Sequence, residues 1–196
     1  MIKMDFILSE SDLKKCQTFC DEMVKFQKTQ RNGGDLTRNE IIKKYDIRRG
    51  KIAEFIVKSF FKTLGKECDI DLKVYGWGVW DDGDIIIDDK TFSIKSAKYF
   101  SSWLLLEKEN RKWEKPPNYF VFVLINKEET GGTICGFTTP DEIFQDSRLQ
   151  LKGDKLKGTN TILDVTNYCI HKSDLDNNWN MFEFCGLDRI ILKNSD

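Results

Sequence analysis

Residues 81–98 of this chain combine acidic and basic side chains with an apolar alternation, in the sequence DDGDIIIDDKTFSIKSAK. With a two-residue turn at Asp89-Lys90, this segment predicts a hairpin in which Asp84 lies opposite Lys95. One face of the hairpin is then wholly apolar and must belong to the core; it consists of Ile85, Ile87, Phe92 and Ile94. The other face brings a carboxylate and an ammonium group together beyond the turn.

A strongly apolar helix precedes the hairpin and carries one charge of interest. The pattern predicts a helix over residues 48–64, with Gly65 as its end. Its apolar residues cover too much of the circumference for a surface helix, so we expect it to pack against a sheet. Glu54 lies within this apolar stretch. It is therefore a candidate site residue, and the alternative is an ordinary ion pair with Lys58, four residues further on.

The remaining elements predict an α/β (α+β) fold in which helices flank a central mixed sheet. Periodicity and turn signals predict an amphipathic helix over 9–30, a short helix from the capping box at Thr37 through Lys44, strands over 73–79, 119–125 and 133–138, and a short helix after Thr139-Pro140. The apolar run over 119–125 indicates a central strand that is covered on both faces. With 196 residues and no linker-like segment, we expect a single domain.

This ordered set of a helix with a glutamate, a hairpin with an aspartate and a lysine, and an apolar strand resembles the PD-(D/E)XK nuclease superfamily. Gly83-Asp84 corresponds to the "PD" and Ser93-Ile94-Lys95 to the "(D/E)XK". The resemblance covers about residues 45–125 and implies a restriction-endonuclease-like core. The N-terminal helices over 9–45 and the C-terminal part over 139–196 are then elaborations of a single nuclease domain spanning 1–196.

The resemblance implies a magnesium site with one altered ligand. Ser93 stands where the family has an acid, and a hydroxyl is a weak ligand for Mg²⁺. We predict that Glu54 supplies the missing carboxylate, so that Asp84, Glu54 and the Ile94 carbonyl hold Mg²⁺, with Mn²⁺ as a possible substitute. Lys95 would then position or deprotonate the attacking water, or stabilise charge in the transition state.

Each of these site residues also has a structural interpretation. Asp84 lies in a turn-rich stretch, Lys95 suits an exposed strand end, and Ser93 suits an ordinary strand position. Asp82 and Asp88 are reserve ligands. The two interpretations stay open at the level of sequence.

Double-stranded DNA is the partner that the resemblance implies, and several basic residues are candidates to bind it. Arg48, Arg49 and Lys51 open the helix that carries Glu54, where backbone N–H groups also face outward, and Lys98 follows Lys95. Their alternative role is solvated surface. The formal net charge of −1 counts against a protein that coats nucleic acid, but it does not exclude a local basic cleft.

We therefore expect a Mg²⁺-dependent endodeoxyribonuclease, a Type II restriction endonuclease that acts as a homodimer. The homodimer is implied by the resemblance alone. The alternatives are a repair, recombination or mobile-element nuclease of the same fold, or a catalytically silent DNA-binding or interaction protein that kept the fold. We expect a cytoplasmic protein with no membrane span. Its six cysteines lack CxxC spacing and indicate buried free thiols rather than zinc ligands.

Overall fold

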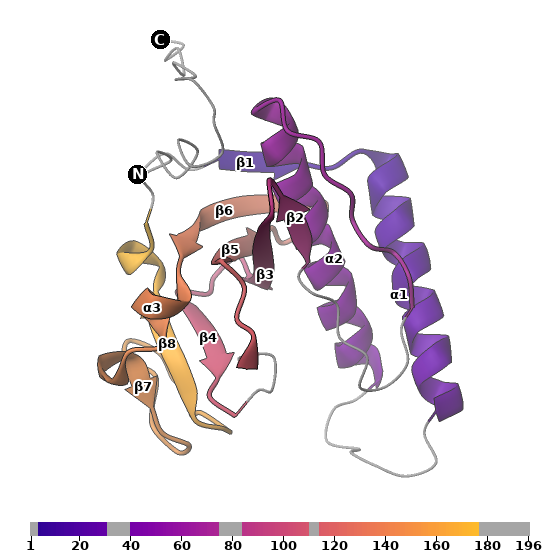
Figure 1. Ribbon diagram of the computed structural model, residues 1–196. Helices are drawn as coiled ribbons and strands as arrows, with labels where there is room; N and C mark the ends of the chain where they lie inside the picture. The colour runs from indigo at the N-terminus through magenta and orange to yellow at the C-terminus, as the bar shows by residue number, and fades with distance from the viewer. Residues whose placement is uncertain (1–3, 31–39, 75–83, 110–113, 177–196) are drawn as a thin grey trace.

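The computed structural model describes residues 4–30, 40–74, 84–109 and 114–176. Its mixed α/β fold has three layers: a pair of long helices, a curled mixed sheet of five strands, and a smaller sheet of three strands (Figure 1). In order across the large sheet lie β1 (Met4–Ile7), β6 (Gly131–Thr138), β5 (Tyr119–Ile125), β3 (Lys90–Lys98) and β2 (Ile85–Ile87). The small sheet contains β4 (Trp103–Glu107), β8 (Asn167–His171) and β7 (Leu149–Gln150).

β5 is the central strand of the large sheet, as the sequence predicts. It runs parallel to β3 and antiparallel to β6. Alternate side chains of β5 enter two different clusters: Val121, Val123 and Ile125 pack with the long helices, and Phe120, Phe122 and Leu124 pack with the small sheet. Because both faces of the strand are buried, all its residues after Tyr119 can be apolar.

The two long helices are α1 (Glu10–Gln30) and α2 (Glu40–Thr63). The Ser9 hydroxyl accepts a hydrogen bond from the Asp12 backbone N–H and caps α1. α2 ends at Thr63, and Gly65, two residues later, has a φ of 73°, the left-handed conformation that glycine adopts without steric cost. The prediction of two helices, one through Lys44 and one from Arg48, is wrong. Neither Gly nor Pro separates the two stretches, and the helix continues through them.

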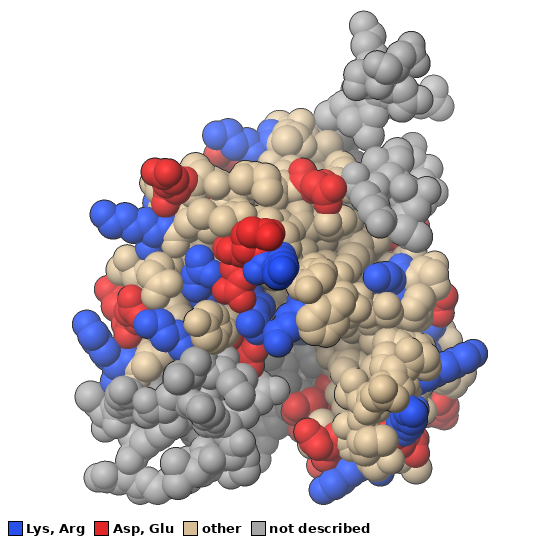
Figure 2. Space-filling view, turned by 180° about the vertical axis from the view of Figure 1, so that it is seen from behind, with Lys and Arg blue, Asp and Glu red and all other residues tan. Residues whose placement is uncertain are grey.

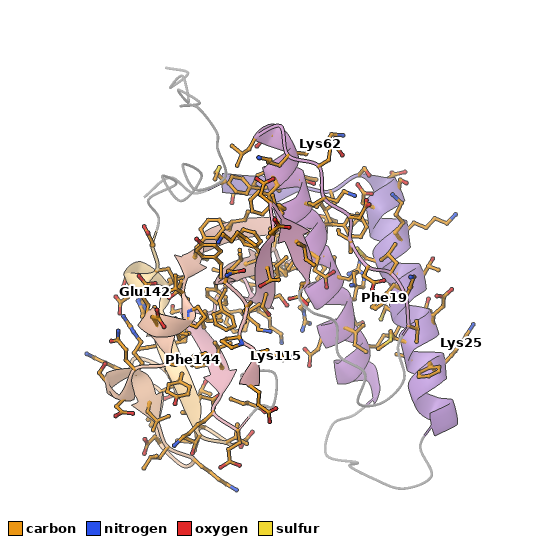
Figure 3. The ribbon with its side chains drawn as sticks, viewed as in Figure 1. Phe19, Lys25, Lys62, Lys115, Glu142 and Phe144 are labelled. Atoms are coloured by element: carbon orange, nitrogen blue, oxygen red, sulfur yellow. The ribbon has the colours of Figure 1, made fainter. Side chains whose placement is uncertain are left out.

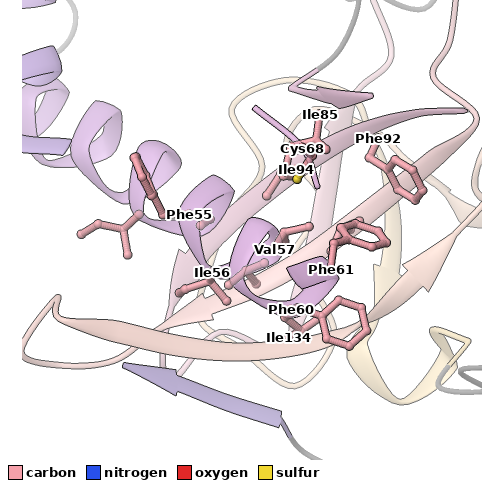
Figure 4. Packing of buried hydrophobic residues seen from close by; sticks show 14 of the residues in the cluster. Phe55, Ile56, Val57, Phe60, Phe61, Cys68, Ile85, Phe92, Ile94 and Ile134 are labelled. Carbon is pink, nitrogen blue, oxygen red and sulfur yellow. The ribbon is translucent and has the colours of Figure 1, made fainter. Parts of the chain in front are cut away.

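Aromatic and branched side chains of α2 pack directly on the large sheet (Figure 4). Phe60 and Phe61 are at most 1% exposed and contact each other at a centroid distance of 5.4 Å, and Phe61 also meets Phe92 of β3 at 5.0 Å. Truncating a buried phenylalanine to alanine costs about 3–5 kcal/mol. The predicted deep packing of this helix against a sheet is confirmed.

Two adjacent glycines allow β6 to lie between its two neighbours. A Cβ atom at Gly131 would collide with the Phe6 carbonyl oxygen of β1, and one at Gly132 would collide with the Leu124 carbonyl oxygen of β5. The same edge is joined by a hydrogen bond from the Thr133 hydroxyl to the Asp5 carboxylate. Close backbone approach therefore requires glycine at both positions.

The other short elements are α3 (Pro140–Ile143) and two 3₁₀ turns, η2 (Asp146–Arg148) and η3 (Lys172–Asp174). The short helix predicted after Thr139-Pro140 is confirmed as α3, and Thr139 and Glu142 exchange hydrogen bonds in a capping box at its start. Figure 3 shows Glu142 and Phe144 at this helix, and the Phe144 ring contacts Tyr168 of β8. Of the predicted strand over 73–79, residues 73 and 74 are not in a strand and the rest lie outside the described residues. No described helix is both long enough and apolar enough to cross a membrane.

Candidate functional site

The β2–β3 hairpin turns one step earlier than the sequence suggests. Asp88 and Asp89 form the turn with φ of 48° and 62°, and Ile85 pairs with Phe92. The predicted turn at Asp89-Lys90 is therefore wrong by one residue, and the predicted pairing of Asp84 with Lys95 is wrong by two. Positive φ at both turn positions matches the right-handed twist of the strands, and aspartate tolerates that conformation.

The two faces of the hairpin are nevertheless as predicted, because a shift of two residues returns every side chain to its original face. The four residues of the apolar face are at most 7% exposed: Ile85, Ile87, Phe92 and Ile94. Ile86, on the opposite face, is 53% exposed. The apolar face packs with α2, so Ser93 and Lys95 point away from the long helices.

Asp84 lies at the start of the hairpin and binds the middle of β3. Its Oδ2 accepts a hydrogen bond of 2.5 Å from the Ile94 backbone N–H and one of 3.3 Å from the Ser93 hydroxyl. β2 begins only at Ile85, so the carboxylate takes the place of a neighbouring strand for the Ile94 N–H. Within the described part of the chain, Oδ1 of Asp84 makes no hydrogen bond.

The Ile94 carbonyl is directed to the same edge of β3 as its N–H, since both groups of a strand residue point to one neighbour. Lys95 is half-buried, and its side chain shares a face with Ser93 and with Phe122 of the neighbouring strand. Residues two apart on a strand are separated by roughly 6.6 Å. The structure thus brings together Asp84, Ser93 and the Ile94 backbone, with Lys95 next along that face.

Glu54 is placed differently from these residues. It lies on α2, which covers the face of the sheet that Ile94 enters, and its Oε2 accepts a hydrogen bond of 2.6 Å from Lys51. The alternative pairing with Lys58 is wrong, because Lys58 lies 3.7 Å from Asp69 instead. The role of Glu54 as a metal ligand stays a prediction. In that role the Glu54 carboxylate would accept the hydrogen bond from Lys51 and bind the metal ion at the same time.

Lys51 is held from three directions. Besides Glu54, its ammonium donates to the Asp71 carbonyl at 2.9 Å and lies 4.3 Å from the centre of the Phe19 ring. Figure 3 shows Phe19 on α1 beside α2. The Lys51 side chain is only 9% exposed, so it is poorly placed to meet a phosphate.

Arg48 and Arg49, the other predicted DNA contacts on this helix, share a carboxylate. Glu129, in the turn between β5 and β6, accepts from Arg48 at 2.7 Å and from Arg49 at 2.8 Å. Arg49 also binds Asp46 at 3.0 Å. Sequence reasoning missed this network, because nothing in the chain marks a glutamate 80 residues away as the partner of two arginines.

Lys98 is the exposed member of the predicted DNA contacts. It ends β3, and its ammonium lies 5.9 Å from the centre of the Phe100 ring. The rings of Tyr99 and Phe100 are exposed beside it. This aromatic pair was missed by the sequence reasoning, although a lysine followed by two aromatic residues is a local signal that could have identified it.

The described residues contain no group of three or more His, Cys, Asp or Glu side chains that could hold a metal. Of the reserve ligands, Asp88 binds Lys66 at 2.5 Å and Asp82 lies outside the described residues. As predicted for free thiols, Cys16 and Cys169 are buried and unpaired. Burial raises the pKa of Cys16 to about 12 and that of Cys169 to about 11, so both thiols are protonated at neutral pH.

The surface charge is mixed on the face of the molecule that Figure 2 draws. Figure 2 shows basic and acidic side chains interleaved over one face rather than one broad field of a single sign. Long-range attraction of DNA is therefore weak, and any binding must depend on local groups. Comparison of the chain with protein-family models, with curated proteins and with solved structures finds no match.

Proposed function

We propose that this protein is a Mg²⁺-dependent endodeoxyribonuclease of the PD-(D/E)XK type that hydrolyses phosphodiester bonds in double-stranded DNA. One observation carries the proposal. The Asp84 carboxylate is fixed on the Ser93-Ile94 segment of β3, and Lys95 follows on the Ser93 face. A carboxylate, a backbone carbonyl and an ammonium group at one strand edge are the groups that metal-assisted phosphoryl transfer uses.

The order of elements around this edge supports the proposal. α2 is followed by the β2–β3 hairpin, and the chain then crosses to β5, which lies parallel to β3. This is the sequence of helix, hairpin and next core strand that the resemblance implies for residues 45–125. The crossing segment contains β4 of the small sheet.

The donor groups fit a hydrated Mg²⁺ ion. Mg²⁺ in phosphoryl-transfer sites keeps several waters and is held by one or two carboxylates together with substrate phosphates. Asp84 would bind through Oδ1, since Oδ2 is occupied by Ile94 and Ser93. The Ile94 carbonyl lies at the same edge of β3, and Glu54, which is on α2 and binds Lys51, would have to reach the same ion to complete the proposed set. When bound, the ion would supply polarisation of the scissile phosphate and orientation of a water.

The protein side chains have separate tasks in this proposal. Ser93 donates to Asp84 and holds its carboxylate against β3. Lys95 stabilises the negative charge that develops on the phosphate oxygens or positions the attacking water. One such site cuts one strand, so the proposal includes a homodimer of a Type II restriction endonuclease. A repair, recombination or mobile-element nuclease has the same site and would cut without a fixed recognition sequence.

Plasmid DNA tests the proposal. The chain should convert supercoiled plasmid to cut forms with Mg²⁺ and not with a chelator. Lys95→Ala and Asp84→Asn should lower the rate by at least about 100-fold. Lys90→Ala, on the same strand at the turn, is the matched control and should cut at the parent rate. Equal rates for Lys95→Ala and the parent would overturn the proposal. Discrete bands indicate a restriction enzyme, and a smear indicates a non-specific nuclease.

A silent DNA-binding protein of the same fold is the second candidate. It is favoured by Ser93 in place of an acid and by the hydrogen bonds that already use one oxygen of Asp84. This candidate predicts DNA binding without cleavage in either Mg²⁺ or Mn²⁺. It also predicts that Asp84→Asn lowers stability, because the Ile94 N–H loses a charged acceptor.

A further inference from the structure

Two aromatic rings stand exposed where β3 ends. Tyr99 is 51% exposed and Phe100 is 67% exposed. Their rings meet edge to face, with centroids 5.2 Å apart and planes at 85°. In this geometry one ring contributes only its edge to the contact, so ring faces remain open to a ligand. Neither ring belongs to the buried clusters of the fold.

One lysine contacts these rings, and a second binds the backbone of the residue that follows them. Lys98 is in cation–π contact with Phe100, and Lys172 donates from its ammonium to the Ser101 carbonyl at 3.2 Å. Within the described part of the chain, neither ammonium group forms an ion pair. We call Lys98, Tyr99, Phe100 and Lys172 the β3-end surface. It offers cations for phosphate and aromatic faces for planar groups.

We propose that the β3-end surface binds an unpaired stretch of DNA, with bases stacked on Phe100 and Tyr99 and phosphates near Lys98 and Lys172. The inference rests on the proposed function, because it states which kind of DNA, one with an unpaired strand, the proposed nuclease site acts on. Base–aromatic stacking is indifferent to sequence, since every base has a π face. The lysines supply the electrostatic part of the affinity.

The β3-end surface lies further along the strand that carries Lys95. Lys98 follows Lys95 by three residues, about 10 Å along β3, so the two side chains leave opposite faces of the strand. A DNA strand that contacts both lysines must therefore pass around the end of β3, where Tyr99 and Phe100 are exposed. Duplex DNA is too stiff to bend over so short a distance at low cost, so the substrate that we propose is DNA with unpaired nucleotides close to the cleaved bond.

A second copy of the chain fits this surface less well. Two partly exposed aromatic side chains supply far less than the roughly 800 Å² per partner that a stable interface buries. The adjacent lysines would also face each other across a two-fold contact. The combination of rings with unpaired cations favours a polyanion that has planar groups.

Binding to oligonucleotides tests the inference in the full chain. In a Lys95→Ala background without metal, fluorescence anisotropy compares a single strand of about 15 nucleotides with the same sequence as a duplex. Phe100→Ala and Tyr99→Ala should each weaken binding of the single strand about tenfold and binding of the duplex less than about twofold. Phe100→Trp should retain affinity. Ile162→Ala, at another exposed apolar side chain, is the matched control and should bind as the parent does.

An abasic strand of the same length separates stacking from charge. It keeps the phosphates and lacks the bases, so Phe100→Ala should bind it as well as the parent does. Equal losses on the abasic and normal strands would overturn the inference, as would no loss on either. A change of oligomeric state in Phe100→Ala, seen by sedimentation, would overturn it in favour of a second copy.

Failure of the proposal about the β3-end surface can be distinguished from failure of the nuclease proposal. If parent protein does not cut DNA in Mg²⁺ but binds single strands through Phe100, the stacking surface stands and the nuclease proposal fails. If the parent cuts and Phe100→Ala changes neither binding nor cleavage, the nuclease proposal stands and this inference fails.

Discussion

The basic residues of α2 and those at the end of β3 look alike in the sequence, but the fold uses them in opposite ways. Arg48, Arg49 and Lys51 each bind a carboxylate, and their side chains are 20%, 15% and 9% exposed. Lys98 contacts the exposed Phe100 ring, Lys172 binds the Ser101 carbonyl next to it, and neither forms an ion pair within the described residues. Basic side chains that already have carboxylate partners hold the helix in place, whereas those without are available to a ligand.

The paired group connects parts of the fold that are distant in sequence. Glu129 joins two arginines of α2 to the turn between β5 and β6, and Lys51 joins the same helix to the Asp71 carbonyl. Each removal of a partner leaves a charge in a partly buried position, where water screens it poorly. Removing one partner of an ion pair should therefore affect the basic residues of α2 and those at the end of β3 differently. The largest effect is expected for the substitution of Glu54.

Glu54→Gln separates the two roles of Glu54. If the carboxylate is a metal ligand, cleavage should fall by about 100-fold or more and recover partly at high Mg²⁺ or with Mn²⁺. Lys51→Met removes the ion pair but keeps the carboxylate, so it should lower stability and preserve cleavage. Plasmid cleavage and thermal melting of both variants measure this. Full activity of Glu54→Gln together with an inactive Ser93→Ala would assign the second ligand to Ser93.

Glu129→Gln should lower the free energy of unfolding by about 2 kcal/mol, because both arginines lose their shared acceptor in a position that is mostly buried. The melting temperature should then fall by roughly 4–8 °C for a chain of this size. Glu128→Gln, at the exposed neighbouring position, should change stability by less than about 0.5 kcal/mol. A Glu129→Gln protein that melts with the parent would show that the network contributes nothing.

Lys98→Gln and Lys172→Gln should lower the affinity for DNA and leave the stability nearly unchanged, unlike Glu129→Gln. Stability should change by less than about 0.5 kcal/mol, since neither ammonium group has a carboxylate partner among the described residues. Affinity for single-stranded DNA should fall, and the slope of log K against log salt should decrease by about 0.7 for each phosphate that is no longer neutralised. A titration at several salt concentrations measures the slope. An unchanged slope would remove these lysines from the binding surface.

The ion pair of Asp21 with Lys44 should have the smallest effect, since it is exposed. The hydrogen bond from Lys44 lowers the pKa of Asp21. A carboxylate with a lowered folded pKa adds stability above its unfolded pKa of about 4, and that stability is lost as pH falls through the folded value. Urea midpoints of the parent and Asp21→Asn should therefore differ slightly at about pH 5 and converge toward about pH 2. A gap that widens on acidification would contradict the assignment.

The sequence predicted faces and elements better than it predicted partners. The alternation Phe92-Ser93-Ile94, paired with the strand over Ile85–Ile87, determined which side of the hairpin is buried. Alternation repeats every two residues, so it could not detect a register error of two, and Asp88-Asp89 carries no glycine to mark the turn.

Elements without alternation were missed. β4 reads as a continuous apolar run, yet Leu105 is 37% exposed between Leu104 and Leu106, which are each 2% exposed. The run alone does not show that a second sheet exists or which side it covers. The partners of Arg48 and Arg49 likewise depend on a turn that tertiary structure brings close. In the candidate site, the sequence predicted correctly that Asp84, Ser93 and Lys95 share one face of the hairpin. The ion pair of Glu54 with Lys51 joins residues three apart on one helix, so the sequence could also have indicated it.

The pairing of β1 with β6 has a consequence for the order of folding. Met4 lies beside Ile134, so this edge of the large sheet joins residues about 130 positions apart and raises the contact order of the fold. At a synthesis rate of about 5–20 residues per second, β1 emerges roughly 6–25 s before the glycines that let β6 approach it. During that interval α1 and α2 can form and pair, because they are close in sequence, while the strand before them has no edge to join. Refolding from denaturant tests the contact-order argument on the complete chain, and it should show helix signal before protection of the β1 amides.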